Sequence, residues 1–379
     1  MDLGKWKVLK SKAIYGANAS GKSNLLKAML LFIRLVSDSV RDERLLQTDM
    51  VPFIFTNDVL QPSFFQMIFV VDGVQYRYGF ETSDQLILSE WLFGTPGKKE
   101  VNFFTRDGQG IKINEKQFNE AAKLKEAVRP NALFLTVVKT LNGELAKKLV
   151  GFITGIIAIS GLGDKQLYER ASEAIIHEKM RAQIVKMLKM ADVGIDSLSH
   201  LEVDAGEHTL PKKEKGQPTK TFFVMTGHNR RDKKTNEMIQ AGLSMDLHES
   251  EGTKKMFELS PVILTAMEEN RPLIMDEFDA RFHPLLSQKL VELFNSEVND
   301  KKTQFIFATH DTNLLQADLL RRDQICFVEK DKEGASHFYS LADFKGVRND
   351  ASFEKDYIMG RYGAIPFIGD FQSLFETHA

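Results

Sequence analysis

Apolar positions along the chain follow two different periods, and their order predicts an α/β fold. Residues 7–16 read as a strand that enters a glycine-rich loop. The segment 24–46 that follows has the 3.6-residue period of an amphipathic helix. The apolar side of this helix is formed by Leu25, Met29, Phe32 and Val36.

The stretch from residue 64 to residue 81 predicts a β-hairpin. Its apolar and aromatic runs flank Asp72 and Gly73, a dipeptide that tight hairpin turns favour. Further strand patterns follow at 86–93 and 101–105.

Helical patterns dominate between residues 115 and 195. The longest apolar stretch, 149–163, is too short to cross a bilayer, which takes about 20 residues. We interpret this stretch as a buried helix and expect no membrane association. Residues 207–236 are polar and rich in Lys, Gly and Pro, which indicates a loop or hairpin.

From residue 253 onward, helical and strand patterns alternate, which is typical of a parallel sheet with crossover helices. We therefore expect a discontinuous core domain, residues 1–114 and 240–379. A helical insertion, residues 115–239, would interrupt it and end in a basic hairpin or loop. The alternating elements are expected at 254–269, 271–277, 285–298, 303–310, 312–320 and 323–330.

Composition restricts the location and partners of the protein more than its fold. The 50 basic and 52 acidic residues give a net charge of −2, so no overall field draws the chain to nucleic acid. The single cysteine, Cys326, excludes an internal disulfide framework. Since the N-terminus also lacks the apolar core of a secretory signal, we expect a cytoplasmic protein.

The first of four chemical motifs is GANASGKS at residues 16–23. Its G-x-x-x-x-G-K-S spacing, between a strand and a helix, is typical of a loop whose backbone N–H groups wrap phosphates. Lys22 adds a positive charge, and the Ser23 hydroxyl would reach a Mg²⁺ ion. ATP is the expected nucleotide, and its expected contacts are Gly16, Asn18, Ser20, Gly21, Lys22, Ser23 and Asn24.

The second motif places Asp276 and Glu277 at the end of a predicted strand. At the carboxyl edge of a parallel sheet, both side chains can reach a nucleotide crevice. Asp276 is placed to hold Mg²⁺ through water, and Glu277 to act as general base on the attacking water. A solvated strand end is the plainer alternative. Asp279 completes a D-E-x-D pattern, which leaves a metal-dependent nuclease as a further one.

The third motif delivers Thr309, His310 and Asp311 to the same expected edge. A histidine there can hydrogen-bond a γ-phosphate and report its loss, although a structural histidine is the alternative. The order of the motifs along the chain favours the sensor.

The fourth motif, ESEGT at residues 249–253, precedes an amphipathic helical run. A helix start of this kind exposes several backbone N–H groups, which suits an anion such as a phosphate. Ser250, Gly252 and Thr253 are the expected contacts.

Taken in order, these motifs resemble those of ABC-type ATPase heads of the SMC, RecF and Rad50 kind. The sequence is more closely similar to the ATP-binding proteins of bacterial abortive-infection and anti-phage loci, the RloA, AbiL and PtuA-like group. The similarity includes AIYGANASGKSNLLKA, ESEGTKKMFEL, DEFDARFHPLL, FATHDTNLL, LRRDQICFVEKD and GRYGAIPFIGDF. It implies a P-loop NTPase fold with a mainly parallel core sheet, an antiparallel β subsheet and a helical insertion.

The resemblance also implies a second copy of the chain. In ABC heads the signature segment, here Glu249 to Thr253, binds the nucleotide held by the other protomer. Ser250 and the N–H of Gly252 would then touch a γ-phosphate on the partner's Lys22 loop. ATP would join a homodimer, or a higher assembly, around composite sites, and hydrolysis would release it. By analogy, the dimer would act in defence and control a separate effector, such as a TOPRIM-like or HNH nuclease.

Three features depart from the family pattern. His283 stands where the family places a dimer-facing aspartate, and packing with Pro284 is its alternative role. Thr140 falls nearest to the expected Q-loop glutamine, which predicts weaker positioning of Mg²⁺ and water and hence slow turnover. Only 12 residues precede the AIYG strand, so the adenine contacts are not assigned.

Several alternatives stay open. The basic tract at 212–234 is either a solvated hairpin or a contact for nucleic acid or a partner. In the tail, Arg361, Tyr362 and Phe367 form either core packing or a docking edge. The rival functions are a DNA-repair clamp of the RecF or Rad50 sort and a phosphoryl transferase. The tract contains Lys212, Lys213, Lys215, Lys220, Arg230, Arg231, Lys233 and Lys234.

Overall fold

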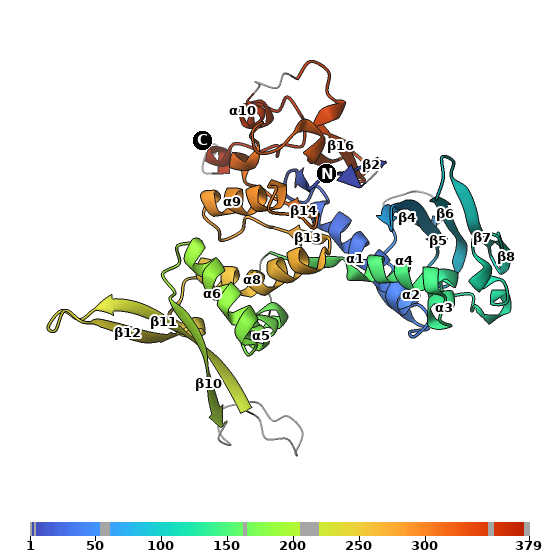
Figure 1. Cartoon of the computed structure of the whole chain (residues 1–379). Helices are drawn as coiled ribbons and strands as arrows, with labels where there is room; N and C mark the ends of the chain where they lie inside the picture. Colours follow the sequence, from blue (N-terminus) through green and yellow to red (C-terminus); the bar gives the residue numbers. More distant parts are fainter. Residues whose placement is uncertain are drawn as a thin grey trace.

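A six-stranded mixed sheet lies at the centre of the computed structural model (Figure 1). The structure describes residues 2–3, 5–53, 61–161, 165–204, 220–347 and 352–374. The strand order is β16-β15-β3-β14-β13-β9, with only β16 antiparallel to its neighbour, so the predicted parallel core is confirmed. The strands are β3 Ser11–Tyr15, β9 Ile157–Ser160, β13 Leu273–Asp276, β14 Phe305–Ala308, β15 Ile325–Lys330 and β16 Ser336–Ser340.

Helices cover both faces of this sheet because successive strand residues point to opposite sides. Ala13 and Tyr15 pack with α8, α9 and α10, whereas Ile14 packs with α1 on the other face. The predicted helix over 24–46 ends earlier than expected and is followed by a separate short helix, α2. These helices are α1 Lys22–Asp38, α2 Leu45–Asp49, α8 Glu251–Glu269, α9 Pro284–Asn295 and α10 Phe353–Ile358.

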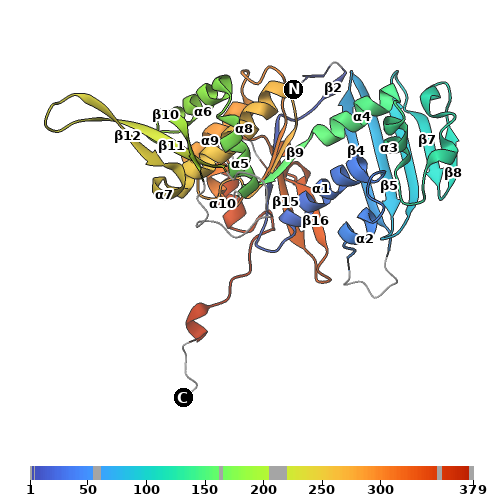
Figure 2. The ribbon, with the colours of Figure 1, turned by 90° about the horizontal axis from the view of Figure 1, so that it is seen from below.

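A second, five-stranded antiparallel sheet of order β4-β5-β6-β7-β8 lies beside the first (Figure 2). The predicted hairpin turn is confirmed, since Asp72 and Gly73 have φ angles of 51° and 75° between β4 and β5. The inner face of the sheet packs on the distal half of α1 through Phe32, Leu35 and Val36. Its strands are β4 Ser63–Val71, β5 Val74–Thr82, β6 Ile87–Thr95, β7 Val101–Asp107 and β8 Gly110–Ile113.

A buried ion pair holds the helices α3 (Phe134–Thr140) and α4 (Glu144–Gly155) against this second sheet. Glu90 and Arg106 have fully buried side chains whose charged atoms lie 3.6 Å apart. The Glu90 carboxylate accepts the N–H groups of Phe134 and Leu135 at 2.6 and 3.0 Å, so it caps the first turn of α3. Arg106 donates to the carbonyl of Ala132, just before that helix.

We expect Glu90→Gln to destabilise the protein by about 3–5 kcal/mol, because it leaves the buried Arg106 charge without its counter-ion. Urea unfolding followed by far-UV circular dichroism measures the change. Glu81→Gln, on the exposed side of β5, is the matched control and is expected to cost less than about 0.5 kcal/mol. Equal unfolding midpoints for the two variants would show that the pair does not anchor α3.

Two sequence predictions fail between residues 115 and 161. The predicted buried helix over 149–163 is wrong in its second part, because α4 ends at Gly155 and β9 then pairs with β13. Since β9 belongs to the central sheet, residues 115–160 are not part of a helical insertion. Farther along, the helix predicted at 312–320 is reduced to one 3₁₀ turn, Thr312–Leu314.

The inserted part begins with two helices packed on α8, namely α5 Lys165–Ala174 and α6 Glu178–Met190. It continues as a three-stranded antiparallel sheet that projects from the body (Figures 1 and 2), which we call the arm. Of the hairpin or loop predicted at 207–236, the described residues from 220 onward belong to the hairpin of β11 and β12, whereas Lys212, Lys213 and Lys215 lie outside the described residues. The arm strands are β10 Ser197–Asp204, β11 Lys220–Arg231 and β12 Met238–Ser244.

The remaining elements are short. Asp2–Leu3 and Trp6–Lys7 pair as β1 and β2, and Met245–His248 forms α7 before α8. Within the described ranges, no helix is long and apolar enough to cross a membrane. The other 3₁₀ helices are Asn119–Ala121, Lys125–Ala127, Arg322–Gln324, Leu341–Asp343 and Phe371–Leu374.

Candidate functional site

Three of the four sequence motifs meet at the carboxyl edge of the central sheet. Strand β3 runs into the loop 16–21, β13 ends at Asp276 and Glu277, and β14 leads to His310. Because β14 lies between β3 and β13 and all three strands are parallel, these segments leave the sheet side by side. The sequence prediction of a common site is thus confirmed in its geometry.

Two glycines in the loop have no room for a side chain. A Cβ at Gly16 would lie 2.5 Å from the carbonyl oxygen of Val328, and one at Gly21 would lie 2.1 Å from the Ser336 hydroxyl. Gly21 also has a φ of 111°, which residues with a side chain rarely adopt. Ser336 donates a hydrogen bond to the Ser20 carbonyl at 2.8 Å. The β15–β16 hairpin therefore sets the shape of the loop.

The start of α1 is suited to an anion. Gly21 is its N-cap and offers no side-chain hydrogen bond, and the first turn carries no acidic residue. The first backbone N–H groups of α1 thus have no side-chain acceptor, and the helix dipole adds positive potential there. The Ser20 hydroxyl is buried and has no hydrogen-bond partner in the described part of the chain. These groups fit a bound phosphate.

The Lys22 side chain lies over the same loop and is only 6% exposed. Its ammonium group donates to the carbonyls of Gly16 and Ala17 at 2.8 and 3.1 Å. Burial lowers the pKa of Lys22, while the nearby carboxylates of Asp276 and Glu277 act in the opposite direction. The ammonium group of Lys22 is thus close enough to the carboxylates at the end of β13 to interact with them electrostatically.

His310 also interacts electrostatically with Lys22 and these carboxylates. Desolvation, followed by the charge of Lys22, lowers the pKa of His310, whereas the carboxylates of Asp279, Glu277 and Asp276 oppose this shift. The imidazole is therefore neutral at neutral pH, and a neutral ring can donate one hydrogen bond to a phosphate oxygen.

The acidic pair has an uncommon backbone. Glu277 has a φ of 47°, and its N–H donates to Asp276 Oδ1 at 3.0 Å. Ser23, in the first turn of α1, and Asp276 offer the oxygen ligands that Mg²⁺ prefers and would be the residues to hold it. Across the described residues, no group of three or more His, Cys, Asp or Glu side chains could hold a metal ion.

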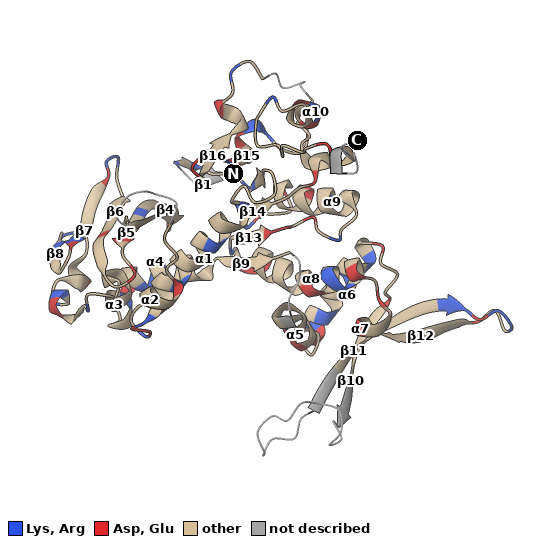
Figure 3. Cartoon of the chain, turned by 180° about the vertical axis from the view of Figure 1, so that it is seen from behind, with Lys and Arg blue, Asp and Glu red and all other residues tan. Residues whose placement is uncertain are grey.

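The fourth motif, ESEGT, starts a different helix from the one that follows the phosphate loop, and it contacts the segment after the acidic pair, where Arg281 pairs with Glu251 at 2.9 Å. Ser250 is the N-cap of α8, and its hydroxyl accepts the N–H of Thr253 at 3.1 Å. Figures 2 and 3 place α7, which directly precedes this segment, beside the arm and apart from α1. The start of α8 is therefore a second helix N-terminus, distinct from the one at the phosphate loop, and its first turn carries Glu251.

The arm is bonded directly to this signature segment. The Glu249 carboxylate accepts from His228 Nε2 at 2.7 Å and from the Thr226 hydroxyl at 2.6 Å. Both partners lie on β11, whose outer end carries a concentration of basic residues (Figure 3). These two hydrogen bonds thus connect the arm to the residue that precedes the N-cap of α8.

Thr140 and His283, two positions where the sequence differs from the family pattern, each make a local hydrogen bond in a helix. Thr140 is the last residue of α3, and its hydroxyl donates to the carbonyl of Thr136 at 2.8 Å. His283 caps α9 by accepting the N–H of Leu285 at 3.2 Å, with Pro284 at the first helical position. His283 and Pro284 are both exposed, so the structure shows a helix cap here and no packing of the two side chains.

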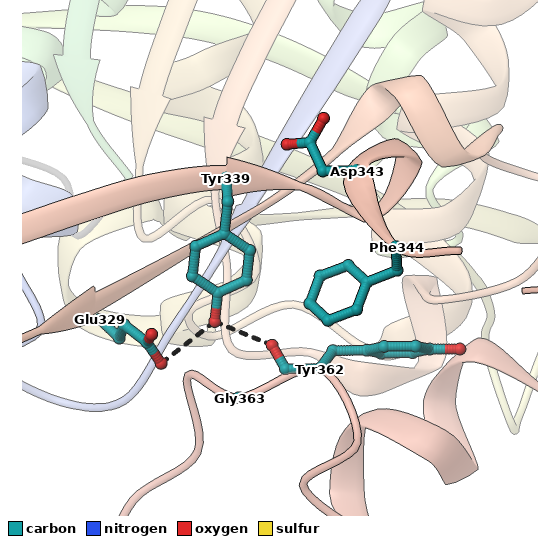
Figure 4. Close-up of a pocket in the computed structure, with 6 residues that line it drawn as sticks. All are labelled: Glu329, Tyr339, Asp343, Phe344, Tyr362 and Gly363. Carbon is teal, nitrogen blue, oxygen red and sulfur yellow. Dashed lines mark hydrogen bonds between the residues drawn. The ribbon is translucent and has the colours of Figure 1, made fainter. Parts of the chain in front are cut away.

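The C-terminal tail is partly core and partly exposed. Tyr362 is 3% exposed, whereas Phe367 is fully exposed. Tyr362 and Gly363 line a cavity of about 410 Å³ with Tyr339, Phe344, Glu329 and Asp343 (Figure 4). This cavity lies on the sheet face that Tyr339 and Phe327 share with α10, opposite α1. It is therefore separate from the phosphate loop.

One family model matches residues 13–136 and 191–316, and it is described as "AAA domain, putative AbiEii toxin, Type IV TA system". The matched residues make up most of the chain and include all four motifs. The chain belongs to this family. The family carries an AAA-type ATPase domain, in agreement with the α/β fold and the phosphate loop described above.

Solved structures similar to the chain include SMC heads of low sequence identity. The SMC head domain from Thermotoga maritima is 13% identical, with a TM-score of 0.42, over 87% of this chain and 89% of that one. An SMC head bound to the C-terminal winged-helix domain of ScpA is 15% identical, with a TM-score of 0.45, over 88% and 90%. No curated protein matches the chain.

Two residues near the motifs escaped sequence analysis. Ser336, which shapes the phosphate loop, is the first residue of β16 and follows a polar turn with no motif of its own. Lys255 is buried at 1% exposure in the first turns of α8. A signal for Lys255 was present, because it lies four residues before Leu259 and eight before Ile263, on the apolar stripe of the helix.

We expect Lys22→Ala to weaken Mg-ATP binding by about 10- to 100-fold, since it removes a charged hydrogen-bond donor to the phosphates. Isothermal titration calorimetry measures the dissociation constant. Lys27→Ala, which removes an exposed lysine from the same helix, should bind as tightly as the wild type. Equal affinities of the two variants would remove the loop from the nucleotide site.

Proposed function

We propose that the protein is an ATP-hydrolysing switch that closes as a dimer around two Mg-ATP molecules. Lys22 and the start of α1 bind the phosphates, Ser23 and Asp276 hold Mg²⁺, and Glu277 activates the attacking water. His310 contacts the γ-phosphate and changes its hydrogen bonding when that phosphate leaves. The lid over each nucleotide is the segment Glu249–Thr253 of the second chain.

The observation that carries this proposal is the separation of two helix starts. The start of α1 lies at the acidic edge with Lys22, whereas the start of α8 lies by the arm. A single chain thus offers a cradle for a phosphate at α1 and, at α8, a second helix N-terminus, which Ser250 caps and whose first turn carries Glu251. In two copies related by a twofold axis, each nucleotide would lie between the start of α1 of one chain and the start of α8 of the other, so two nucleotides would occupy all four helix starts.

A role in prokaryotic defence is supported by the family description, whose wording is "putative AbiEii toxin, Type IV TA system". In this role, the ATP-bound dimer controls a separate effector, for which a TOPRIM-like or HNH nuclease is our candidate. The exposed Phe367 and Ile368 of the tail are 100% and 72% exposed and offer apolar contacts for such a partner.

Mixing of two inactive variants tests the composite site. Lys22→Ala spoils the cradle of its own chain, and Ser250→Ala spoils the lid that the chain offers its partner. Each variant alone should hydrolyse little ATP. An equal mixture should recover at most about a quarter of the wild-type rate, since half of the dimers are mixed and each has one intact site.

Ser250→Thr is the control for the helix cap, because threonine keeps the hydroxyl and costs little at an N-cap. Its ATP hydrolysis should stay close to that of the wild type. Failure of the mixture to recover any hydrolysis, together with a single-chain mass in light scattering with ATP, would contradict the proposal. A monomeric phosphoryl transferase would give that outcome and a phosphorylated product.

A DNA-repair clamp is the second candidate, and the exposed basic tip of the arm favours it. Arg230, Arg231, Lys233 and Lys234 are all exposed there. This function predicts that duplex DNA raises the ATPase rate and that binding weakens steeply with salt. Lys233→Ala with Lys234→Ala should then lower DNA affinity, while Lys289→Ala on α9 should not. Electrophoretic mobility shifts at two salt concentrations measure the affinity, and no shift at low salt would exclude this candidate.

A further inference from the structure

Lys255 joins the signature helix to the backbone around the proposed general base. Its side chain is buried, and its ammonium group donates to the carbonyls of Phe278 at 2.8 Å and Glu277 at 3.4 Å. The carbonyl of Ala280 is a third acceptor. The same group lies 4.3 Å from the centre of the Phe282 ring, where a cation–π attraction adds to the hydrogen bonds.

The chemistry of the contact calls for an ammonium group. Three carbonyl oxygens from the segment 277–280 converge on one point, and a lysine has three N–H donors and no acceptor. Without that donor, the carbonyl group of Phe278 would lose a buried hydrogen bond, which is unfavourable.

Two more contacts hold the segment 277–282 against the first turn of α8. Arg281 pairs with Glu251 at 2.9 Å. A Cβ at Gly252 would lie 2.9 Å from the carbonyl oxygen of Arg281, so glycine permits the close approach. The start of α8 and the segment that follows Asp276 are therefore in direct contact.

The segment held in this way has a strained backbone. Glu277 and Arg281 have φ angles of 47° and 67°, in the left-handed region that residues with side chains disfavour. Such conformations are unfavourable and persist only where surrounding contacts impose them. A shift of Lys255 therefore gives the Glu277 peptide room to relax.

We infer that Lys255 is a positioning residue. Through it, the nucleotide in one composite site determines the position of Glu277, the general base, in the other site. This inference rests on the proposed dimer. The start of α8 faces the phosphate held by the second chain, while Lys255, one turn along the same helix, holds the Glu277 backbone of its own chain. A phosphate that draws the helix start toward itself thus moves Glu277 in the opposite site.

The charged groups around Lys255 predict a pH dependence for this link. Burial lowers the pKa of Lys255 to about 8, and the charge of Arg281 acts in the same direction. The carboxylates of Asp279, Glu277 and Glu258 oppose the shift. The ammonium form is therefore present at pH 7 and is lost as the pH rises through 8, and the link weakens in that range.

The test compares Lys255→Met, Lys255→Arg and the control Lys254→Met, which removes a charge from the same helix turn. ATPase rates are measured against ATP concentration, at protein concentrations where the dimer is complete. The wild type should give a Hill coefficient clearly above one. Lys255→Met should reduce kcat by about tenfold or more, an increase in barrier of about 1.4 kcal/mol. It should leave KM within about twofold and lower the Hill coefficient to one.

Lys255→Arg keeps the charge and should restore most of kcat and of the cooperativity. It should also remove the fall in rate above pH 8, because an arginine stays protonated there. Lys254→Met should behave as the wild type. If Lys255→Met is too unstable to purify, Lys255→Arg and the wild-type pH profile still decide the question.

A Lys255→Met enzyme with wild-type kcat and cooperativity would overturn the inference. So would a wild-type Hill coefficient of one, or an alkaline fall in rate that Lys255→Arg leaves in place. Failure of the dimer itself is a different result, since light scattering then gives a single-chain mass with ATP. Recovery in the Lys22→Ala and Ser250→Ala mixture with an unchanged Lys255→Met variant would reject the link alone.

Discussion

Parallel pairing of β3, β14 and β13 fixes where the chemistry of this protein can occur. Strands that run in one direction end at one edge, so segments almost 300 residues apart in sequence emerge together. The phosphate loop, the Asp276–Glu277 pair and His310 owe their proximity to this pairing. The apolar residues on both faces hold the sheet in place, with α1 on one side and α8 and α9 on the other.

The start of helix α8 connects the carboxyl edge of the central sheet to the arm. Its first residues form the signature segment, Lys255 contacts the backbone after Asp276, and Glu249 just before it bonds to β11 of the arm. The arm, the proposed lid for a second chain and the proposed catalytic segment are thus linked by hydrogen bonds at the start of one helix. Nucleotide, partner chain and any ligand of the arm would act on the same few peptide groups.

Sequence patterns predicted the motifs and the parallel core because these depend on local spacing. The Gly16–Ser23 spacing and the apolar strands before Asp276 and His310 are readable without tertiary contacts. Strand β9 was missed because Ile157–Ser160 continues the apolar run of α4, and periodicity cannot separate a short buried strand from a helix. Lys255 was missed because its acceptors are carbonyls of a loop more than 20 residues later in the sequence, brought close only by folding.

The central claim is that each nucleotide is enclosed by two chains, and a structure of Glu277→Gln with Mg-ATP tests it most directly. The decisive distance joins the Ser250 hydroxyl of one chain to the γ-phosphate on the Lys22 loop of the other. Our account predicts a hydrogen bond there, within about 3 Å, at both sites of a symmetric dimer. A nucleotide enclosed by one chain alone, with the start of α8 exposed to solvent, would contradict it.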